Sequence, residues 1–150
     1  MEILFKTDGS IFGSDCEALV NPVNTYGVCG KGLALKFKNM YPMNYRIYRR
    51  AYLTHELAIG KIITCVDAGK TIMNFPTKLH WRDPSHLDYI EKGLKAMPGV
   101  IKNLGIKSVA MPALGCGEGG LDWKEVKDLI LAEAKTWELD LFLEVYDPPK

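Results

Sequence analysis

The stretch SVAMPALGCGEGGLDWKEVKDLILAEAKTW, residues 108–137, contains the parts of an α/β unit in order. Residues 108–114 form a short apolar run, which predicts a buried strand. A loop with four glycines follows, and apolar side chains then recur at helical spacing over residues 122–138. The positions predicted to face inward on this helix are Val126, Ile130, Ala134 and Trp137. A buried strand that passes through a glycine loop into an amphipathic helix indicates a layered α/β domain.

The rest of the chain shows the same alternation. Strands are predicted over residues 2–7, 18–24 and 140–147, and residues 61–76 predict two strands joined by a turn at Asp67-Ala68-Gly69. Helices are predicted over residues 32–41, 44–53 and 86–105, the last of them kinked or split at Pro98-Gly99. We therefore expect a three-layer α/β/α domain around a largely parallel or mixed sheet of about six strands.

Length and composition predict one ordinary globular domain. The chain has 150 residues, of which 47% are hydrophobic and 25% charged, and we expect residues 1–150 to form a single domain. No apolar run approaches the roughly 18 residues of a membrane span. The N-terminal segment MEILFKTDGS lacks the basic and apolar regions of a signal peptide, so we expect a cytoplasmic protein, and a monomer by default.

The four cysteines stand at positions 16, 29, 65 and 116, and the three histidines at 55, 80 and 86. None of the cysteines forms a C-x-x-C pair, and a structural zinc site needs closer ligand spacing. We therefore expect reduced thiols and no metal.

Charge is distributed unevenly along the chain. Six basic residues and no acidic ones lie between Ala18 and His55, whereas the segment from Glu56 to Lys150 has 12 basic and 14 acidic residues. The first third of the chain should therefore carry a local positive surface, which favours contact with phosphates.

Two glycine-rich loops open predicted helices. One contains Gly30, Lys31 and Gly32, and the other contains Gly115, Gly117 and Gly119. Glycines allow several backbone N–H groups to point at one place, and a helix start adds its dipole, so both loops suit a phosphate or diphosphate. The glycines alone are equally compatible with tight strand-to-helix turns. In parallel sheets, ligands bind outside the carboxyl ends of the strands, which is where both loops are predicted to lie.

The segment KTIMNFPTKLHWRDPSH, residues 70–86, ends a predicted strand in an unusual loop. An ordinary connector would use Gly, Asn, Asp or Ser, but this loop carries Lys78, His80, Trp81 and Arg82. His80 suits acid–base chemistry or a phosphate contact. Trp81 and Arg82 suit stacking on and pairing with a DNA strand, or they brace the loop. Taken alone, Lys78 is better interpreted as a solvated loop lysine.

Three segments together resemble the macrodomain family, the ADP-ribose-binding fold, over nearly the whole chain: LVNPVNTYGVCGKGLALKFK (19–38), NFPTKLHWR (74–82) and MPALGCGEGGLDW (111–123). Within that family they are most similar to the DarG group, antitoxin macrodomains that remove ADP-ribose from thymidine bases in DNA. The resemblance implies a DNA ADP-ribosyl glycohydrolase that acts on single-stranded DNA and reverses a DarT-type toxin. It implies no cofactor, with ADP-ribose as ligand or product.

The resemblance also implies a role for each matching position. Asp8 would hold the adenine amino group, with Gly9 close by, and Asn24 would bind the distal ribose; their alternative interpretation is as turn residues. Lys78 would be the catalytic residue beside the anomeric carbon, and Thr77 before it would contact ADP-ribose. The residues that would hold the diphosphate and distal ribose are Gly30, Lys31, Gly32, Gly115, Cys116, Gly117, Glu118 and Gly119.

Two more residues are candidate ligand contacts because of their position on predicted strands. Asn21 could bond to ribose hydroxyls or cap a turn. Tyr146, near the end of the last strand, could stack on a base, although a core tyrosine is the better interpretation of the sequence alone.

One departure from the family pattern leaves the second catalytic group open. Protein-directed relatives use an aspartate that resolves the reaction intermediate, and here that position corresponds to Gly119, as in the DNA-directed group. Candidate auxiliary groups are His80, Glu118 and Asp122. Asp122 also has a structural interpretation, because it precedes a helix with Glu125 three residues later, the pattern of a capping box.

The catalytic mechanism and the kind of ADP-ribose conjugate that serves as substrate also stay open. A lysine attacks an anomeric carbon only when neutral, and burial and the charges of His80 and Arg82 would lower its pKa. Attack by Lys78 would expel the base and leave a lysyl–ribose adduct for water to cleave; alternatively, Lys78 protonates the leaving base and water attacks directly. The alternative functions are hydrolysis of protein-linked or O-acetylated ADP-ribose, and ADP-ribose binding without catalysis.

Overall fold

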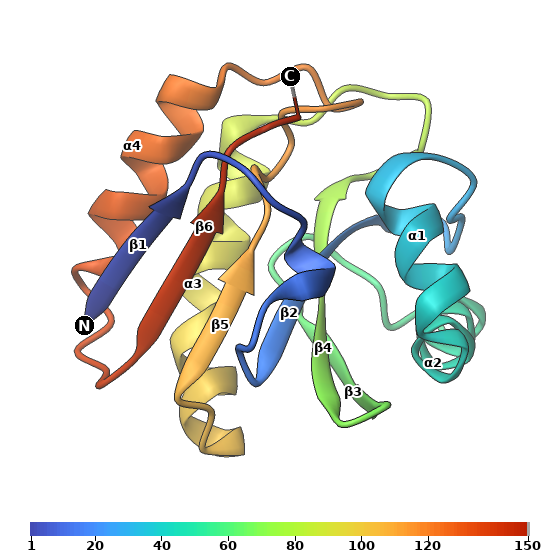
Figure 1. Ribbon diagram of the computed structural model, residues 1–150. Helices are drawn as coiled ribbons and strands as arrows, with labels where there is room; N and C mark the ends of the chain where they lie inside the picture. Colours follow the sequence, from blue (N-terminus) through green and yellow to red (C-terminus); the bar gives the residue numbers. More distant parts are fainter. Residues whose placement is uncertain (150) are drawn as a thin grey trace.

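The computed structural model describes residues 1–149 and has a mixed six-stranded sheet at its centre (Figure 1). The strands are β1 (Glu2–Lys6), β2 (Ala18–Asn24), β3 (Ile63–Asp67), β4 (Lys70–Lys78), β5 (Ser108–Met111) and β6 (Phe142–Tyr146). They lie in the order β1-β6-β5-β2-β4-β3. Every neighbouring pair is parallel except β3–β4, which is antiparallel. The five parallel strands therefore end at one edge of the sheet, the upper edge in Figure 1.

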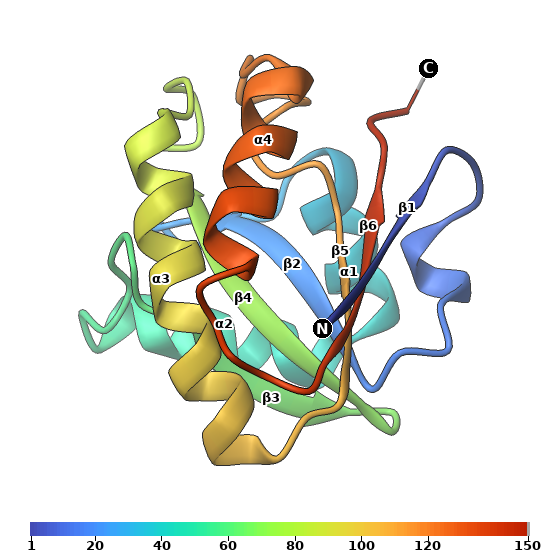
Figure 2. The same cartoon turned by 90° about the vertical axis from the view of Figure 1, so that its left-hand side faces the viewer.

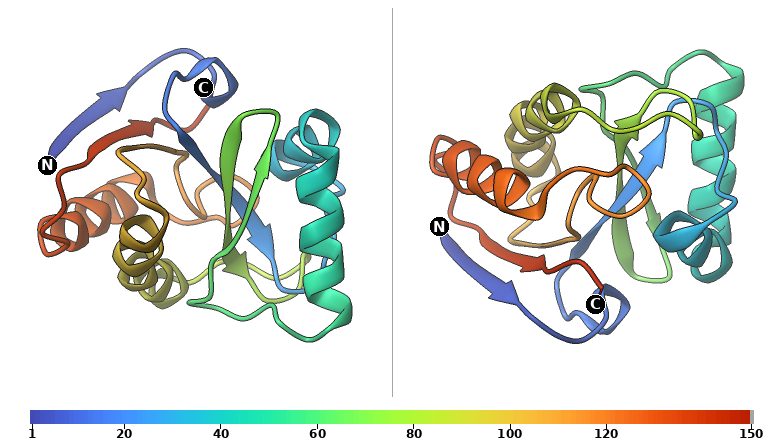
Figure 3. Two further views of the ribbon diagram at one scale, coloured as in Figure 1. Left: turned by 90° about the horizontal axis from the view of Figure 1, so that it is seen from below. Right: turned by 90° about the horizontal axis from the view of Figure 1, so that it is seen from above.

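Helices cover both faces of the sheet, which confirms the predicted three layers. Helices α3 (Leu87–Leu104) and α4 (Trp123–Ala134) lie together against one face (Figure 2). Helices α1 (Gly32–Met40) and α2 (Pro42–Leu53) lie on the other face, over β2 and β4, as the end-on views show (Figure 3). A short 3-10 turn, η1 (Ile11–Gly13), lies beside them.

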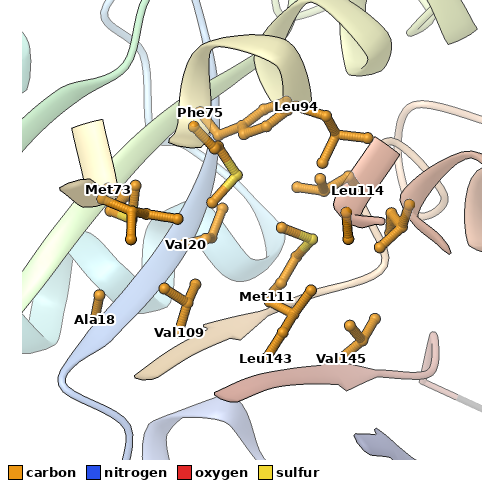
Figure 4. Packing of buried hydrophobic residues seen from close by; sticks show 14 of the residues in the cluster. Ala18, Val20, Met73, Phe75, Leu94, Val109, Met111, Leu114, Leu143 and Val145 are labelled. Atoms are coloured by element: carbon orange, nitrogen blue, oxygen red, sulfur yellow. The ribbon is translucent and has the colours of Figure 1, made fainter. Parts of the chain in front are cut away.

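Alternation along the strands divides the core into two sides. In β2, Ala18 and Val20 pack toward α3 and α4, whereas Leu19 packs on the α1 side. Met73 and Phe75 of β4 join the larger cluster with residues of β5 and β6, and all are fully buried (Figure 4). Because side chains of a strand point alternately to the two faces, near-continuous apolar strands such as β2 require a covered sheet.

Two local predictions can be compared with the structure. The β3–β4 turn forms as expected, with Ala68 at φ 51° and Gly69 at φ 79°. Of the predicted kink or split at Pro98-Gly99, the split is wrong, because α3 runs unbroken from Leu87 to Leu104, and the kink stays a prediction. Leu94, Met97 and Ile101 are buried on both sides of Pro98, and their packing outweighs the roughly 3 kcal/mol that an interior proline costs a helix.

Within residues 1–149, no helix has the length and apolar character that a membrane crossing requires.

Candidate functional site

The loops that follow β5, β2 and β4 lie side by side, because these three strands are neighbours and parallel. The right-hand view of Figure 3 looks down on this edge. Backbone hydrogen bonds join the loops: Ser85 N–H donates to Gly119 O at 3.0 Å, and Thr25 N–H donates to Lys78 O at 3.1 Å and Leu79 O at 3.0 Å. The sheet order thus places the loop that begins at the candidate catalytic lysine next to both glycine-rich loops.

The ends of β1 and β6 form the other part of this edge. Asp8, Gly9 and Tyr146 line a hollow of about 350 Å³ together with Lys6 and Thr7. Tyr146 is only 7% exposed, and its hydroxyl donates to Glu144 Oε1 at 2.6 Å. The tyrosine is therefore held rigidly as one wall of the hollow, and burial is the first cause that raises its pKa.

A β-bulge sets the position of Lys78. Val23 of β2 lies opposite Pro76, but Asn24 lies opposite Lys78, so Thr77 is the extra residue of β4. Thr77 is buried and its hydroxyl donates to Val23 O at 3.4 Å. Bulges change the direction of side chains at sheet edges and beside active sites. This bulge places Lys78, and not Thr77, opposite Asn24 of β2.

The Lys78 side chain is half-buried, and its ammonium donates to Trp81 O at 3.3 Å. Within residues 1–149, no carboxylate lies within 4.0 Å of this nitrogen. His80 Nδ1 accepts a hydrogen bond from Arg82 N–H at 3.1 Å. Of the two charges expected near Lys78, only that of Arg82 is permanent, because a guanidinium stays protonated in proteins.

Asn24 organises the loop after β2. Its Oδ1 accepts from Tyr26 N–H at 2.9 Å and Val28 N–H at 3.3 Å, and its Nδ2 donates to Val28 O at 2.7 Å. The buried Tyr48 hydroxyl has one hydrogen to donate, and both Asn24 O at 2.7 Å and the same Oδ1 at 3.0 Å lie within its reach. The turn-capping role of Asn24 is therefore present, and its ribose contact stays a prediction.

The start of α1 is open to an anion. Gly30, Lys31 and Gly32 are exposed, and Lys31 is the N-cap residue without a side-chain cap bond. The first turn has no acidic residue. The first N–H groups of a helix have no intrahelical partner and carry its positive dipole end, so this terminus favours a phosphate.

The loop after β5 is closely packed. Leu121 N–H donates to Gly115 O at 2.9 Å, and Gly115 has φ +73°. A Cβ on Gly115 would lie 2.7 Å from Leu121 Cδ1, and one on Gly119 would overlap Ser85 Oγ and Gly115 O. Glycine at these two positions thus allows the surrounding chain segments to pack more closely than any residue with a Cβ would permit.

Two groups in this loop have their chemistry set by their surroundings. Burial, with a smaller effect of the Asp122 charge, raises the pKa of the Cys116 thiol to about 11, so it is protonated and unreactive at neutral pH. Asp122 is the N-cap of α4, as expected, but its side chain makes no cap bond, so the capping-box prediction is wrong. The carboxylate is exposed and remains hydrated, as does that of Glu118.

Asn21 lies inside the fold and not at the strand ends. It is 2% exposed, and its Nδ2 donates to Asn74 Oδ1 at 3.1 Å. Asn74 also exchanges hydrogen bonds with Asn44 of α2, at 2.8 and 3.0 Å. This network joins β2, β4 and α2, so we assign Asn21 to the support of the sheet and not to ligand binding.

Sequence reasoning missed two residues at this edge. Ser85 is 4% exposed, holds Gly119 through its backbone, and has a buried hydroxyl without a partner among the described residues. No local pattern marks it, since its neighbours come from another loop. Tyr26 is 45% exposed and contacts His80. An aromatic residue between Asn24 and Gly27, in a loop, was the available signal.

Known proteins share this architecture. The family model described as Macro domain matches residues 20–130. A Mycobacterium tuberculosis protein named DNA ADP-ribosyl glycohydrolase is 48% identical over 128 residues, which are 83% of this chain and 36% of that protein. A Thermosipho africanus protein named DNA ADP-ribosyl transferase-DNA ADP-ribosyl glycohydrolase fusion protein is 36% identical over 164 aligned positions, 97% of this chain and 42% of that one. The chain thus spans less than half the length of either relative.

Two solved structures are similar over nearly all of the chain. The macrodomain of Mycobacterium tuberculosis DarG superposes with a TM-score of 0.91 at 43% identity and covers 98% of both chains. Thermosipho africanus DarTG in complex with ADP-ribose gives a TM-score of 0.86 at 36% identity, over 93% of this chain and 40% of that one. With the family model matching most of the chain, these likenesses show that the chain belongs to the Macro domain family.

Proposed function

We propose that this macrodomain is a DNA ADP-ribosyl glycohydrolase that removes ADP-ribose from thymidine bases of single-stranded DNA, with Lys78 as the catalytic residue. The observation that carries the proposal is the position of Lys78, at a bulged strand end whose carbonyl accepts from Thr25 N–H of the loop after β2, and at the start of a loop that bonds through Ser85 N–H to Gly119 O. The names of the M. tuberculosis and T. africanus relatives support the same activity. Because the chain spans only part of each, the activity is proposed for this domain.

The dimensions of the edge suit an extended ADP-ribose. Three strand spacings separate β6 from β4, which at about 4.8 Å each is roughly 14 Å. Asp8, Gly9 and Tyr146 would take the adenine end of the ligand, and Lys78 would face the anomeric carbon at the other end. The open start of α1 and the Gly115–Gly119 loop lie between them and would hold the diphosphate and distal ribose. The T. africanus protein with ADP-ribose bound supports this ligand.

Lys78 can act in two ways. As a neutral amine, its Nζ attacks the anomeric carbon; the bond from that carbon to the base breaks, the base leaves with its electron pair and takes a proton, and water later cleaves the lysyl–ribose adduct. As an ammonium, Lys78 instead donates its proton to the leaving base while water attacks the same carbon.

A second group is needed to activate water on either route. Asp122 is the stronger candidate because its carboxylate is free of the helix cap and lies close enough to Cys116 to raise the pKa of that thiol. Glu118 and His80 are the other candidates, although Nδ1 of His80 is occupied by Arg82 N–H.

A DarT-type toxin is the proposed partner, because the enzyme would remove the modification that such a toxin adds. The T. africanus relative, whose name joins a transferase and a glycohydrolase in one protein, supports this pairing.

The test is the conversion of a single-stranded oligonucleotide that carries ADP-ribose on one thymidine. We expect wild type to release the unmodified oligonucleotide and Lys78→Ala to lose at least about a hundredfold in rate. Lys78→Arg keeps the charge but can neither become a neutral nucleophile nor readily give up its proton, so its inactivity would show that positive charge alone does not account for the role of Lys78. Lys61→Ala, at an exposed lysine before β3, is the matched control.

ADP-ribose affinity, measured by calorimetry, shows that each variant remains folded and competent to bind. Reduction with borohydride during turnover should trap a Lys78 adduct if the covalent route operates. ADP-ribose binding without cleavage of modified DNA would overturn the proposal and leave hydrolysis of another conjugate, or binding alone, as the function. Full activity of Lys78→Ala would overturn the assignment of Lys78.

A further inference from the structure

Four ring side chains form a continuous row on the surface beside Lys78, which we call the aromatic strip. Its members, in spatial order, are Tyr52, Tyr26, His80 and Trp81. They come from α2, from the loop after β2 and from the loop after β4. Neither the proposed chemistry nor ADP-ribose binding requires Tyr52 and Tyr26.

The rings contact one another in sequence. Tyr52 and Tyr26 stack with centroids 6.3 Å apart and planes 26° apart. Tyr26 meets His80 edge-on at 4.8 Å, and His80 stacks on Trp81 at 5.1 Å and 26°. The strip is therefore at most about 16 Å long, the length of a few stacked bases at 3.4 Å spacing.

A guanidinium group lies at each end of the strip. Arg49 lies 5.1 Å from the Tyr52 ring, and Arg82 lies 4.5 Å from the Trp81 ring. Arg46 and Arg50 of α2 are exposed as well, within the segment from Ala18 to His55 that contains no acidic residue.

The backbone fixes the strip in place. Asn24 Oδ1 accepts from Tyr26 N–H, and Arg82 N–H donates to His80 Nδ1. Gly27 has φ +73°, and a Cβ there would lie 2.8 Å from Tyr52 Cβ, so the close approach of the loop to Tyr52 needs glycine. The strip is thus an ordered surface, and its rings lose little entropy on binding.

The strip is also accessible. Within residues 1–149, the two most exposed side chains among Phe, Tyr and Trp are Tyr26 at 45% and Trp81 at 37%, and both belong to the strip. It adjoins the proposed catalytic residue, since Lys78 Nζ donates to Trp81 O and Thr25 N–H bonds to Lys78 O.

We propose that the aromatic strip binds the bases that flank the modified nucleotide in single-stranded DNA, with Arg49 and Arg82 on the adjoining phosphates. This inference rests on the proposed function for its substrate. A row of aromatic rings flanked by cations is the chemistry that holds single strands, because every base has a face to stack and every linkage a negative charge. A nucleobase would take the outer face of Trp81, and the flexible Arg82 side chain would turn to a phosphate. An apolar protein segment would gain little from guanidinium groups at both ends.

The test uses unmodified oligonucleotides, so it does not depend on catalysis. Fluorescence anisotropy would measure binding of a labelled ten-nucleotide oligothymidine to wild type, Tyr26→Ala and Trp81→Ala. We expect about tenfold weaker binding for each aromatic variant. Tyr26→Phe, which keeps the ring, should restore affinity. Tyr89→Ala, at a partly buried ring of α3 outside the strip, is the matched control.

Further comparisons separate the possible results. Blunt duplex DNA should bind more weakly than the single strand, because its base faces are hidden. Equal binding of oligouridine would support a stacking surface that does not select the sugar. If wild type fails to bind the single strand at low salt, or if Tyr26→Ala and Tyr89→Ala bind alike, the proposal is wrong and the strip is a surface for a protein partner or a brace for the loops. If the single strand binds but no modified DNA is cleaved, the strip stands and the proposed function fails.

When modified DNA is cleaved, kinetics give a second test. The ratio of kcat/KM on a modified ten-nucleotide oligonucleotide to that on a single modified nucleoside should fall about tenfold in Tyr26→Ala. An unchanged ratio would contradict a role in binding flanking bases.

Discussion

Gly119→Ala should be far more damaging than its size suggests. The added Cβ would overlap Gly115 O and Ser85 Oγ and lie 2.9 Å from Ser85 Cβ. One of these atoms belongs to the backbone, so a side-chain rotation cannot relieve the overlap. Overpacking of this kind costs about 1–3 kcal/mol, and displacement of Gly119 O from Ser85 N–H forfeits about 1 kcal/mol more. We expect a loss of about 3 kcal/mol in the free energy of unfolding, or about 6–12 °C in Tm.

Gly117→Ala is the matched control in the same loop. Gly117 is exposed, its φ lies outside the left-handed region, and no atom lies within 4 Å of the position that an alanine Cβ would take. Its stability should stay within about 0.5 kcal/mol of wild type. Urea unfolding followed by tryptophan fluorescence gives the stabilities, and calorimetry with ADP-ribose shows whether the loop still binds. Equal stability and equal ADP-ribose affinity of the two variants would refute the reasoning from overlap.

Other expectations follow from single contacts. Gly99→Ala, in the interior of α3 with open space at the Cβ position, should stabilise the protein by about 1 kcal/mol, and urea unfolding that shows no gain would contradict this. Asn21→Ala should cost about 1–2 kcal/mol through its lost bond to Asn74 and leave ADP-ribose affinity unchanged; a selective loss of affinity would return Asn21 to the binding site. Burial raises the pKa of the Cys29 and Cys116 thiols from 9.0 to about 11. As the pH rises, these thiols therefore ionise in the unfolded chain before they ionise in the folded protein. Their contribution to stability is present below about pH 9 and is lost as the pH rises to about 11. The urea midpoint should therefore fall over that range, and by less in Cys29→Ala.

The order of elements is the part of this fold that the sequence determines by itself. The alternation of apolar strands with amphipathic helices predicts three layers, and the Asp67-Ala68-Gly69 turn predicts the antiparallel β3–β4 pair. These features follow from side chains close together along the chain, whose period and turn chemistry can be read locally. Parallel strands also end at one edge, so the position of Lys78 and the glycines after predicted strands already indicates that they lie near one another.

Tertiary structure decided the features that depend on partners distant in the chain. The helix continues through Pro98 because Leu94, Met97 and Ile101 are buried against the sheet. Helix propensities take no account of such tertiary packing. The bulge at Thr77 exists only in the pairing of β4 with β2, so one strand's sequence cannot show which residue faces Asn24.

The assignment of polar side chains shows the same limit. The sequence gives no reason to distinguish the asparagines at positions 21 and 24. In the structure, however, the Asn21 side chain bonds to Asn74 of the neighbouring strand, whereas the Asn24 side chain bonds to the backbone of its own loop. Tyr26 and Trp81 are 55 residues apart in the chain and form one surface only when β2 and β4 lie side by side. Periodicity and turn residues fix local structure, but which polar and aromatic groups meet is settled by strand order and register.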